Sequence, residues 1–108
     1  MDNFVPSGQS YRGGANPCFP DRPVVTLRIA EIRRGVRRRV GGDFDRDRMI
    51  RILSGVAADL EMPAIIVRPM AQLEGRFSHQ LYAGFHRFSA SIAAGFTYIP
   101  AVIVDLDL

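Results

Sequence analysis

Two nitrogen-rich side chains, His86 and Arg87, lie directly after a glycine and a phenylalanine in the segment Gly84-Phe85-His86-Arg87. A strand pattern precedes Gly84 and a helical pattern follows it, so Gly84 is predicted to make the turn, because glycine accepts a positive φ without strain. His86 and Arg87 then fall in the first turn of a helix, where backbone N–H groups and the helix dipole favour an anion. A guanidinium forks onto phosphate, and an imidazole donates a hydrogen bond or a proton. The segment therefore predicts a phosphate site, with His86 as the candidate catalytic group.

The elements around this segment follow from the apolar spacing. Phe85, Phe88 and Ile92 are spaced to share the buried face of a helix over residues 85–94. Gly95 is predicted to end that helix, and the continuously apolar strand 101–104 after it is predicted to be central in a sheet.

A second helix is predicted over residues 43–60, with Asp45 as its N-cap and Asp47 in its first turn. Gly55 weakens the middle of this helix. The predicted apolar stripe consists of Met49, Ile50, Leu53, Val56, Ala57 and Leu60.

The strand pattern continues on both sides of this helix. Residues 24–32 predict a first strand, and residues 64–67 predict a buried one. Residues 68–79 are a polar connection with a turn around Gly75, which indicates a hairpin leading to a strand over residues 80–83. His79 lacks partners with metal-ligand spacing, so no metal site is predicted.

Residues 1–22 are predicted to form a flexible arm, laid over the domain by Phe4 or Phe19, and residues 23–108 form one domain. Cys18 in the arm is either a reactive thiol or an incidental cysteine. No apolar segment is long enough to span a membrane or to act as a signal peptide, so we expect a cytoplasmic protein.

The chain of 108 residues has a net charge of +3, and all of its 14 basic residues are arginine. Arginine suits phosphate because its charge is permanent and its donors are forked. A charge this small is compatible with binding to nucleotides or nucleic acid but requires neither.

The sequence resembles the ParB/sulfiredoxin superfamily. The resemblance rests on the box Gly84 to Ala90, followed by Ala94-Gly95 and by Ile99-Pro100-Ala101-Val102. It implies an α/β (α+β) domain with a small mixed sheet flanked by helices. A sulfiredoxin needs a cysteine nucleophile where this chain has Phe85, so that reaction is excluded here. The ParB branch has an acidic residue and an arginine where this chain has Phe85 and His86, and Arg87 keeps the arginine that contacts phosphate.

The resemblance also implies which residues hold the nucleotide. Positions that face the phosphates in the sulfiredoxin branch fall on Arg48 and Arg51, which share a helical face. With these two, the predicted nucleotide- and phosphate-binding residues are Arg48, Arg51, Gly84, Phe85, His86 and Arg87. The implied cofactor is a nucleoside triphosphate, ATP or CTP, with Mg²⁺. Phe85 would close the apolar side of the site or stack on the ligand.

Several alternatives stay open. The segment 84–87 also fits a plain strand-to-helix corner, and Arg48 and Arg51 also fit a solvated helix face. The arginines at 33, 34, 37, 38 and 39 fit either a loop facing phosphate, with weak and salt-dependent contact to nucleic acid, or a solvated charge run.

The leading function is a nucleotide-binding module. The rivals are an ATP-dependent phosphotransferase that uses His86 with Asp43 or Asp45, a ParB-like nuclease, and a non-catalytic module that binds a protein partner or forms a homodimer.

Overall fold

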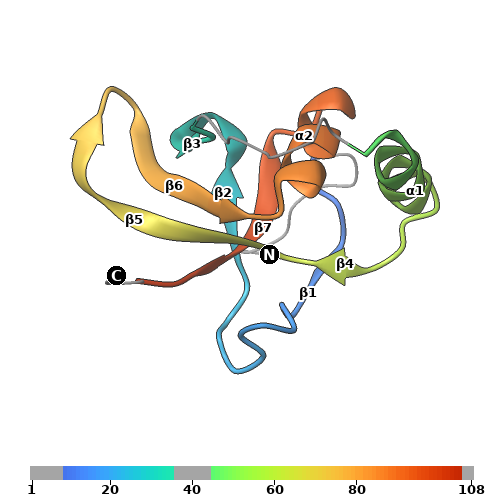
Figure 1. Cartoon of the computed structure of the whole chain (residues 1–108), viewed down its shortest axis with the longest axis horizontal. Coiled ribbons are helices and arrows are strands. Elements are labelled where there is room, and N and C mark those ends of the chain that lie inside the picture. The colour runs from blue at the N-terminus through green and yellow to red at the C-terminus, as the bar shows by residue number, and fades with distance from the viewer. Residues whose placement is uncertain (1–8, 36–44, 106–108) are drawn as a thin grey trace.

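The computed structural model describes residues 9–35 and 45–105, and the side chains of residues 71–74 are not described. Its main sheet has five strands in the order β2-β7-β5-β6-β3, with parallel and antiparallel pairs (Figure 1). A second, two-stranded sheet pairs β1 with β4 in parallel. The elements are β1 (Gly13–Gly14), β2 (Val25–Arg28), the 3-10 helix η1 (Ile29–Glu31), β3 (Ile32–Arg33), α1 (Arg46–Ala57), β4 (Met62–Pro63), β5 (Ile65–Glu74), β6 (Phe77–Ala83), α2 (Phe85–Ala93) and β7 (Tyr98–Ile103). The predicted fold class, a small mixed sheet with flanking helices, is confirmed.

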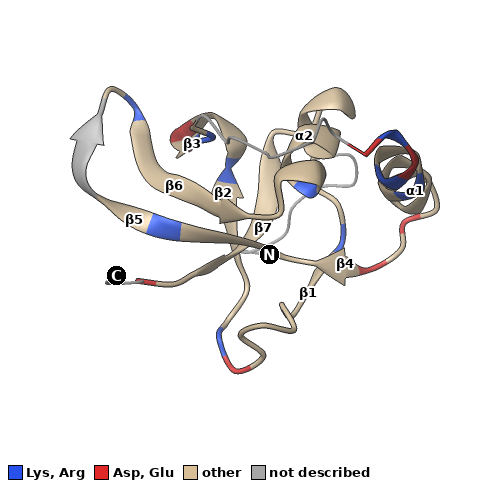
Figure 2. Ribbon diagram, viewed as in Figure 1, with Lys and Arg blue, Asp and Glu red and all other residues tan. Residues whose placement is uncertain are grey.

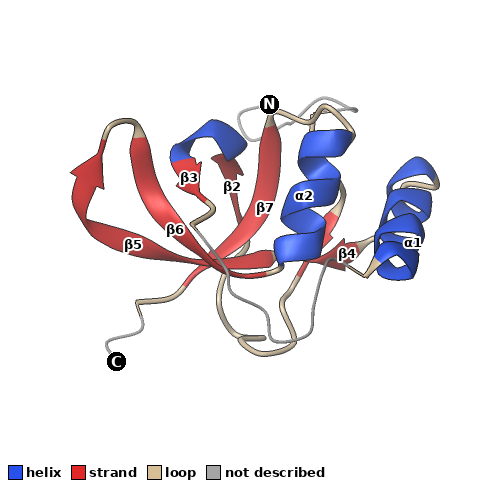
Figure 3. Cartoon of the chain, turned by 45° about the horizontal axis from the view of Figure 1, so that its top comes forward, coloured by secondary structure: helices blue, strands red, loops and turns tan. Residues whose placement is uncertain are grey.

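The main core lies between the sheet and α2. Alternate residues of β5 point to opposite faces, so Ile65 and Val67 pack with Phe88 of α2 while Ile66 packs on the other face. On that other face, Phe19 from the N-terminal segment packs against the second cluster. Figure 3 shows α2 lying along the sheet, with α1 beside α2 at the end of the sheet.

Helix α1 begins as predicted but is shorter and less buried. The side chain of Asp45 accepts a hydrogen bond from the backbone N–H of Arg48, which confirms it as the N-cap. Asp59, with a φ of 58°, follows the end of the helix at Ala57. The predicted stripe is wrong at Ile50, Ala57 and Leu60, which are all exposed, Ile50 by 52% and Leu60 by 57%. The physical reason is that α1 packs along α2 rather than under the sheet, so it buries a narrow stripe.

Two predicted strands have different limits in the structure. The single strand expected over residues 24–32 is divided, because β2 pairs with β7 while β3 pairs with β6 at the opposite edge of the sheet. The hairpin is confirmed, but residues 68–79 form strands rather than a polar connection. Strand β5 continues to Glu74 and β6 begins at Phe77, and the register between the two strands is irregular between Pro69 and Glu74.

The N-terminal segment from residue 9 to residue 22 lies against the domain, although we expected a flexible arm. Tyr11 and Asn16 are each only 4% exposed, and Gly13 and Gly14 pair with β4. The expected contact through Phe19 is present, whereas Phe4 lies outside the described residues. The domain boundary at residue 23 stays a prediction.

The buried face of α2 also differs from the prediction at one position. Ile92 is 54% exposed, and its neighbour Ser91 is fully buried. The Ser91 hydroxyl has no hydrogen-bond partner within the described part of the chain. A buried hydroxyl in this condition costs stability, because its hydration is lost and nothing replaces it.

We therefore expect Ser91→Ala to raise the free energy of unfolding by about 1 kcal/mol, since it removes an unsatisfied group and improves helix propensity. Urea denaturation measures this change. Ser89→Ala, at a half-buried position of the same helix, controls for the propensity gain alone. A loss of stability in Ser91→Ala would show that the hydroxyl is satisfied.

Candidate functional site

The turn between β6 and α2 is made by Gly84, as predicted. Its φ of 96° and ψ of 33° place it in the left-handed region. A Cβ at this position would lie 2.7 Å from Cγ2 and 3.2 Å from Cα of Ile65. Glycine is therefore required at this position for two reasons, its backbone conformation and the close approach of α2 to β5.

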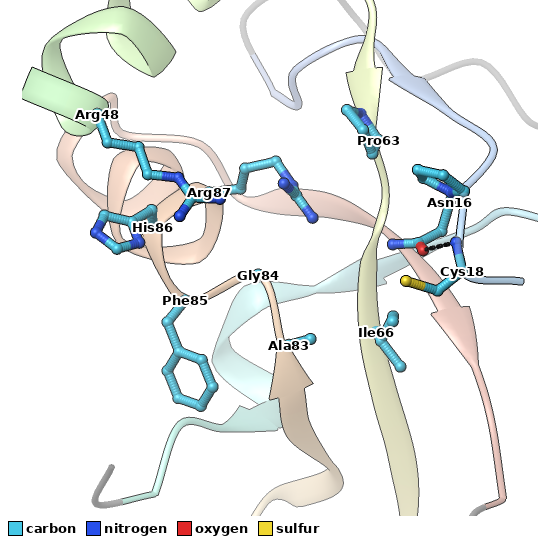
Figure 4. Close-up of a pocket in the computed structure, with 11 residues that line it drawn as sticks. Asn16, Cys18, Arg48, Pro63, Ile66, Ala83, Gly84, Phe85, His86 and Arg87 are labelled. Atoms are coloured by element: carbon cyan, nitrogen blue, oxygen red, sulfur yellow. Dashed lines mark hydrogen bonds between the residues drawn. The ribbon is translucent and has the colours of Figure 1, made fainter. Parts of the chain in front are cut away.

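A cavity of about 340 Å³ opens at this turn. Figure 4 shows the side chains around it, with Arg48 extending from α1, Arg87 from α2, and Asn16 and Cys18 from the N-terminal segment. We call it the arginine cavity. Its lining residues are Asn16, Pro17, Cys18, Arg48, Pro63, Ile66, Ala83, Gly84, Phe85, His86 and Arg87. Because this lining includes two guanidinium groups and no carboxylate, the cavity is suited to an anion.

Arg87 is held weakly in its present position. Its Nη2 donates to the carbonyl of Ala64 over a long 3.4 Å, and its buried Nε has no partner within the described residues. No ion pair joins Arg87 to a carboxylate of the described chain either. The charge and several donors of Arg87 are thus available to a ligand at little cost.

The N-terminal segment closes one side of Arg87. The Asn16 amide donates to the same Ala64 carbonyl at 2.7 Å, and its Oδ1 accepts from the backbone N–H of Cys18 at 2.8 Å. The Tyr11 hydroxyl donates to the carbonyl of Pro63 at 2.7 Å. Burial raises the pKa of Tyr11 to about 12, while the charge of the nearby Arg87 and its side-chain hydrogen bond with Tyr11 act in the opposite direction.

This pKa predicts a loss of stability at high pH. Between pH 10 and about pH 12, Tyr11 loses its proton in the unfolded chain but keeps it in the folded one. The unfolded state then binds fewer protons, so the free energy of unfolding falls by about 1.4 kcal/mol per pH unit in that interval and is unaffected below it. In an absorbance titration of the three tyrosines, one should ionise late, and Tyr11→Phe should remove that late step. Simultaneous ionisation of all three would contradict this assignment.

His86 and Phe85 have structural contacts that the sequence did not predict. Nε2 of His86 accepts the backbone N–H of Asp45 at 3.2 Å, so the imidazole ties the start of α1 to the start of α2. Figure 4 shows the imidazole on the other side of the first turn from the Arg87 guanidinium. Phe85 belongs to the main core, and its ring points away from Arg87. His86 and Arg87 thus both line the cavity while their side chains point apart, and Phe85 contributes to the core as well as to the cavity lining.

Arg48 and Arg51 of α1 are both exposed, and no carboxylate of the described residues pairs with them. Figure 2 shows arginines on α1 and at the start of α2. Arg48 lines the arginine cavity, whereas Arg51 lines a second cavity between α1 and β4. The structure thus places five of the six predicted site residues at the lining of the arginine cavity and the sixth, Arg51, at its neighbour.

Sequence reasoning missed Tyr11, Asn16 and the position of Cys18 at the cavity. An Asn-Pro turn signal was present at residues 16 and 17, but its partner carbonyl lies 48 residues away in the chain. Cys18 is exposed. Sequence patterns report local structure, so they gave no sign that this turn forms a wall of the site.

Other candidate groups lie elsewhere or outside the description. Arg33 and Arg34 are exposed, and residues 37–39 and Asp43 lie outside the described residues. His79 accepts or donates a hydrogen bond with Ser78 at 2.8 Å. Within residues 9–35 and 45–105 there is no cluster of three metal-ligating side chains, and neither helix there is long and apolar enough to cross a bilayer.

Comparison with solved structures supports the fold. The chain is similar to the C-terminally truncated chromosome-partitioning protein ParB from Caulobacter crescentus complexed with CTP-γ-S, with a TM-score of 0.62 and 23% identity over 79% of this chain and 46% of that one. Sulfiredoxin from Arabidopsis thaliana gives 0.60 and 20% identity over 78% of this chain and 86% of that one. The Caulobacter ParB complexed to the centromeric parS site gives 0.57 and 22% identity over 76% of this chain and 39% of that one.

The chain spans less than half the length of these two ParB structures. No curated relative matches it significantly. The ParB N-terminal domain family matches residues 19–108, which include all of the elements from β2 to β7. The predicted resemblance is confirmed, and the chain belongs to the ParB N-terminal domain family.

Proposed function

We propose that this domain binds a nucleoside triphosphate, as its Mg²⁺ complex, with the phosphates in the arginine cavity. The observation that carries the proposal is the state of Arg87, whose buried Nε is unpartnered within the described residues and whose hydrogen bond to the Ala64 carbonyl is 3.4 Å long. A buried donor of a charged group that forms no hydrogen bond lowers the stability of the protein. An anion that accepts a hydrogen bond from Arg87 would therefore be stabilising at this position.

The surroundings of Arg87 support a phosphate in particular. Arg48 brings a second permanent charge to the same cavity, and no carboxylate lines it. The cavity opens at the start of α2, where the helix dipole favours negative charge. Likeness to a ParB that was crystallised with CTP-γ-S supports a nucleotide as the source of that phosphate.

Binding is supported better than catalysis. A general base has to reach the proton that it abstracts. Nε2 of His86 is instead engaged by the backbone N–H of Asp45, and the imidazole lies away from the Arg87 guanidinium. We therefore propose that His86 is a positioning residue that fixes α1, and through it Arg48, beside the cavity.

The thiol of Cys18 gives a direct test, because it is exposed, lines the cavity and is the single cysteine of the chain. We expect CTP or ATP with Mg²⁺ to slow alkylation of Cys18 by a maleimide, and the protection to saturate with nucleotide concentration. Arg87→Ala should abolish the protection while leaving the rate without nucleotide similar. Alkylation that no nucleotide slows would contradict a ligand in this cavity.

A further inference from the structure

Asn16 is a buried polar residue of the N-terminal segment, and both ends of its side-chain amide form hydrogen bonds. The residue is 4% exposed. Its Nδ2 donates to the carbonyl of Ala64 at 2.7 Å, and its Oδ1 accepts the backbone N–H of Cys18 at 2.8 Å. Figure 4 shows the Asn16 amide and the Arg87 guanidinium extending toward each other from the two sides of the cavity. Asn16 therefore lies next to the group that is proposed to bind phosphate.

Asn16 and Arg87 share one acceptor, the Ala64 carbonyl. The hydrogen bond from Asn16 is short, at 2.7 Å, whereas the one from Nη2 of Arg87 is 3.4 Å long. We infer that Asn16 is a positioning residue, which occupies the Ala64 carbonyl and thereby leaves the Arg87 guanidinium available to the phosphates of the nucleotide. This inference rests on the proposed function and adds a residue that precedes the family match, which begins at residue 19.

The backbone of the N-terminal segment fixes Asn16 at this position. The N–H of Ala64 donates to the carbonyl of Gly14 at 3.0 Å, so the segment binds both backbone groups of Ala64. A Cβ at Gly13 would clash with the side chain of Pro100, so the segment needs a glycine to lie this close to the sheet. The amide of Asn16 is therefore held at the Ala64 carbonyl by the chain on either side of it.

Tyr11 of the same segment restrains Arg87 on another side. Its hydroxyl donates to the carbonyl of Pro63 at 2.7 Å and forms a hydrogen bond with the Arg87 side chain. Tyr11 is itself only 4% exposed, so this contact is fixed in place. The guanidinium thus has a rigid partner at Tyr11 and a loose one at Ala64. An arginine held in this way is preorganised, and a ligand pays less to order it.

Loss of the Asn16 amide would change the resting contact of Arg87. Ala64 is fully buried, so its carbonyl needs a donor, and leaving it without one is costly. Nη2 of Arg87 already faces this carbonyl and would move closer to it. A nucleotide would then have to displace a good hydrogen bond instead of a long one, so we expect its affinity to fall.

Asn16→Ser tests this role, because serine can keep the turn but is too short to reach Ala64. Its hydroxyl can accept the backbone N–H two residues later, as Asn16 does at Cys18. By calorimetric titration of the full chain with CTP or ATP and Mg²⁺, we expect Asn16→Ser to weaken binding about fivefold. Alkylation of Cys18 without nucleotide should keep its rate, since the turn is retained.

Asn16→Asp is a second variant with the shape of asparagine. It keeps an acceptor for the Cys18 N–H but replaces the donor to Ala64 by a carboxylate. That carboxylate would compete with phosphate for Arg87, so we expect binding to weaken at least about tenfold. Nucleotide affinity equal to that of the unaltered chain in either variant would overturn the positioning role.

The role of Asn16 also has a spectroscopic signature that needs no nucleotide. In nitrogen-15 spectra of the arginine side chains, the signals of Arg87 are identified by their loss in Arg87→Ala. We expect Asn16→Ser to shift these signals and to slow rotation of the Nη groups, because Nη2 gains a shorter hydrogen bond. A variant that only loosened the fold would not restrict this rotation.

Ser10→Ala is the matched control. The Ser10 hydroxyl belongs to the same segment, donates to the adjacent carbonyl of Tyr11 at 2.7 Å and lines neither cavity. This variant should change neither the nucleotide affinity nor the Arg87 signals. Unchanged Arg87 signals in Asn16→Ser, or equal effects of Asn16→Ser and Ser10→Ala, would overturn the positioning role. Absence of nucleotide binding by the unaltered chain would instead overturn the phosphate site, and the two failures are distinct because the Arg87 signals do not depend on nucleotide.

Discussion

Replacing Arg87 by alanine is expected to weaken binding of a nucleoside triphosphate about 100-fold, which corresponds to about 2.7 kcal/mol. Charge-assisted hydrogen bonds contribute about 1.5–3 kcal/mol each, and a guanidinium can form two of them with one phosphate. The hydrogen bond from Arg87 to Ala64 is long, at 3.4 Å, and the buried Nε is unpartnered within the described residues, so a ligand replaces little existing interaction there.

Two further variants separate the effect of the paired N–H donors of Arg87 from the effect of its charge. Arg87→Lys keeps the charge but not the paired donors, so we expect it to recover only part of the affinity. Arg68→Ala removes one positive charge from an exposed position on β5 that lines neither cavity, and it should leave binding nearly unchanged. An equal effect of Arg68→Ala and Arg87→Ala would show that only the net charge matters.

Replacing Gly84 by alanine is expected to lower the free energy of unfolding by about 3 kcal/mol. The left-handed conformation costs a residue with a Cβ about 1–2 kcal/mol, and overpacking costs about 1–3 kcal/mol. Both apply at Gly84, because the added Cβ would meet Ile65, including its backbone. For a domain of this size the melting temperature should fall by roughly 10 °C or more.

Gly95→Ala is the control for this prediction. Gly95 ends α2 with a φ of 82°, but a Cβ there would meet no atom within 4 Å. It should therefore cost only the conformational part, about 1–2 kcal/mol. Thermal denaturation of both variants measures the difference. Equal losses would show that the close approach of α2 to β5 contributes nothing to stability.

The features that the sequence predicted correctly are those set by neighbouring residues. Gly84 and Gly95 bound α2 because each accepts a positive φ, and Asp45 caps α1 through the backbone N–H of a residue three positions later. The apolar residues 64–67 are buried as predicted, and β5 begins within them at Ile65, because a β-strand inside a sheet is covered on both faces.

What the sequence did not reveal depends on partners far along the chain. Tyr11 is buried by contacts with residues around Pro63, and the N-terminal segment is anchored in the same way by Asn16. Ile50 and Leu60 fit an amphipathic pattern, yet they stay exposed because α1 packs along α2 rather than under the sheet.

The candidate site was predicted in the same uneven way. Gly84 and Arg87 lie where the glycine turn implied, at the start of a helix and at a cavity. The expected convergence of His86 with Arg87 is absent, because the partner of the imidazole is a backbone N–H 41 residues away. Spacing on a helix places two neighbouring residues in the same turn, but it does not determine which way their side chains point.

Calorimetric titration of the full chain with CTP, ATP and GTP, with and without Mg²⁺, tests the phosphate site most directly. We expect saturable heat for at least one of these nucleotides, lost in Arg87→Ala and retained in Arg68→Ala. Absence of heat for all three nucleotides, or binding that is unchanged in Arg87→Ala, would contradict the assignment of the arginine cavity as a nucleotide site.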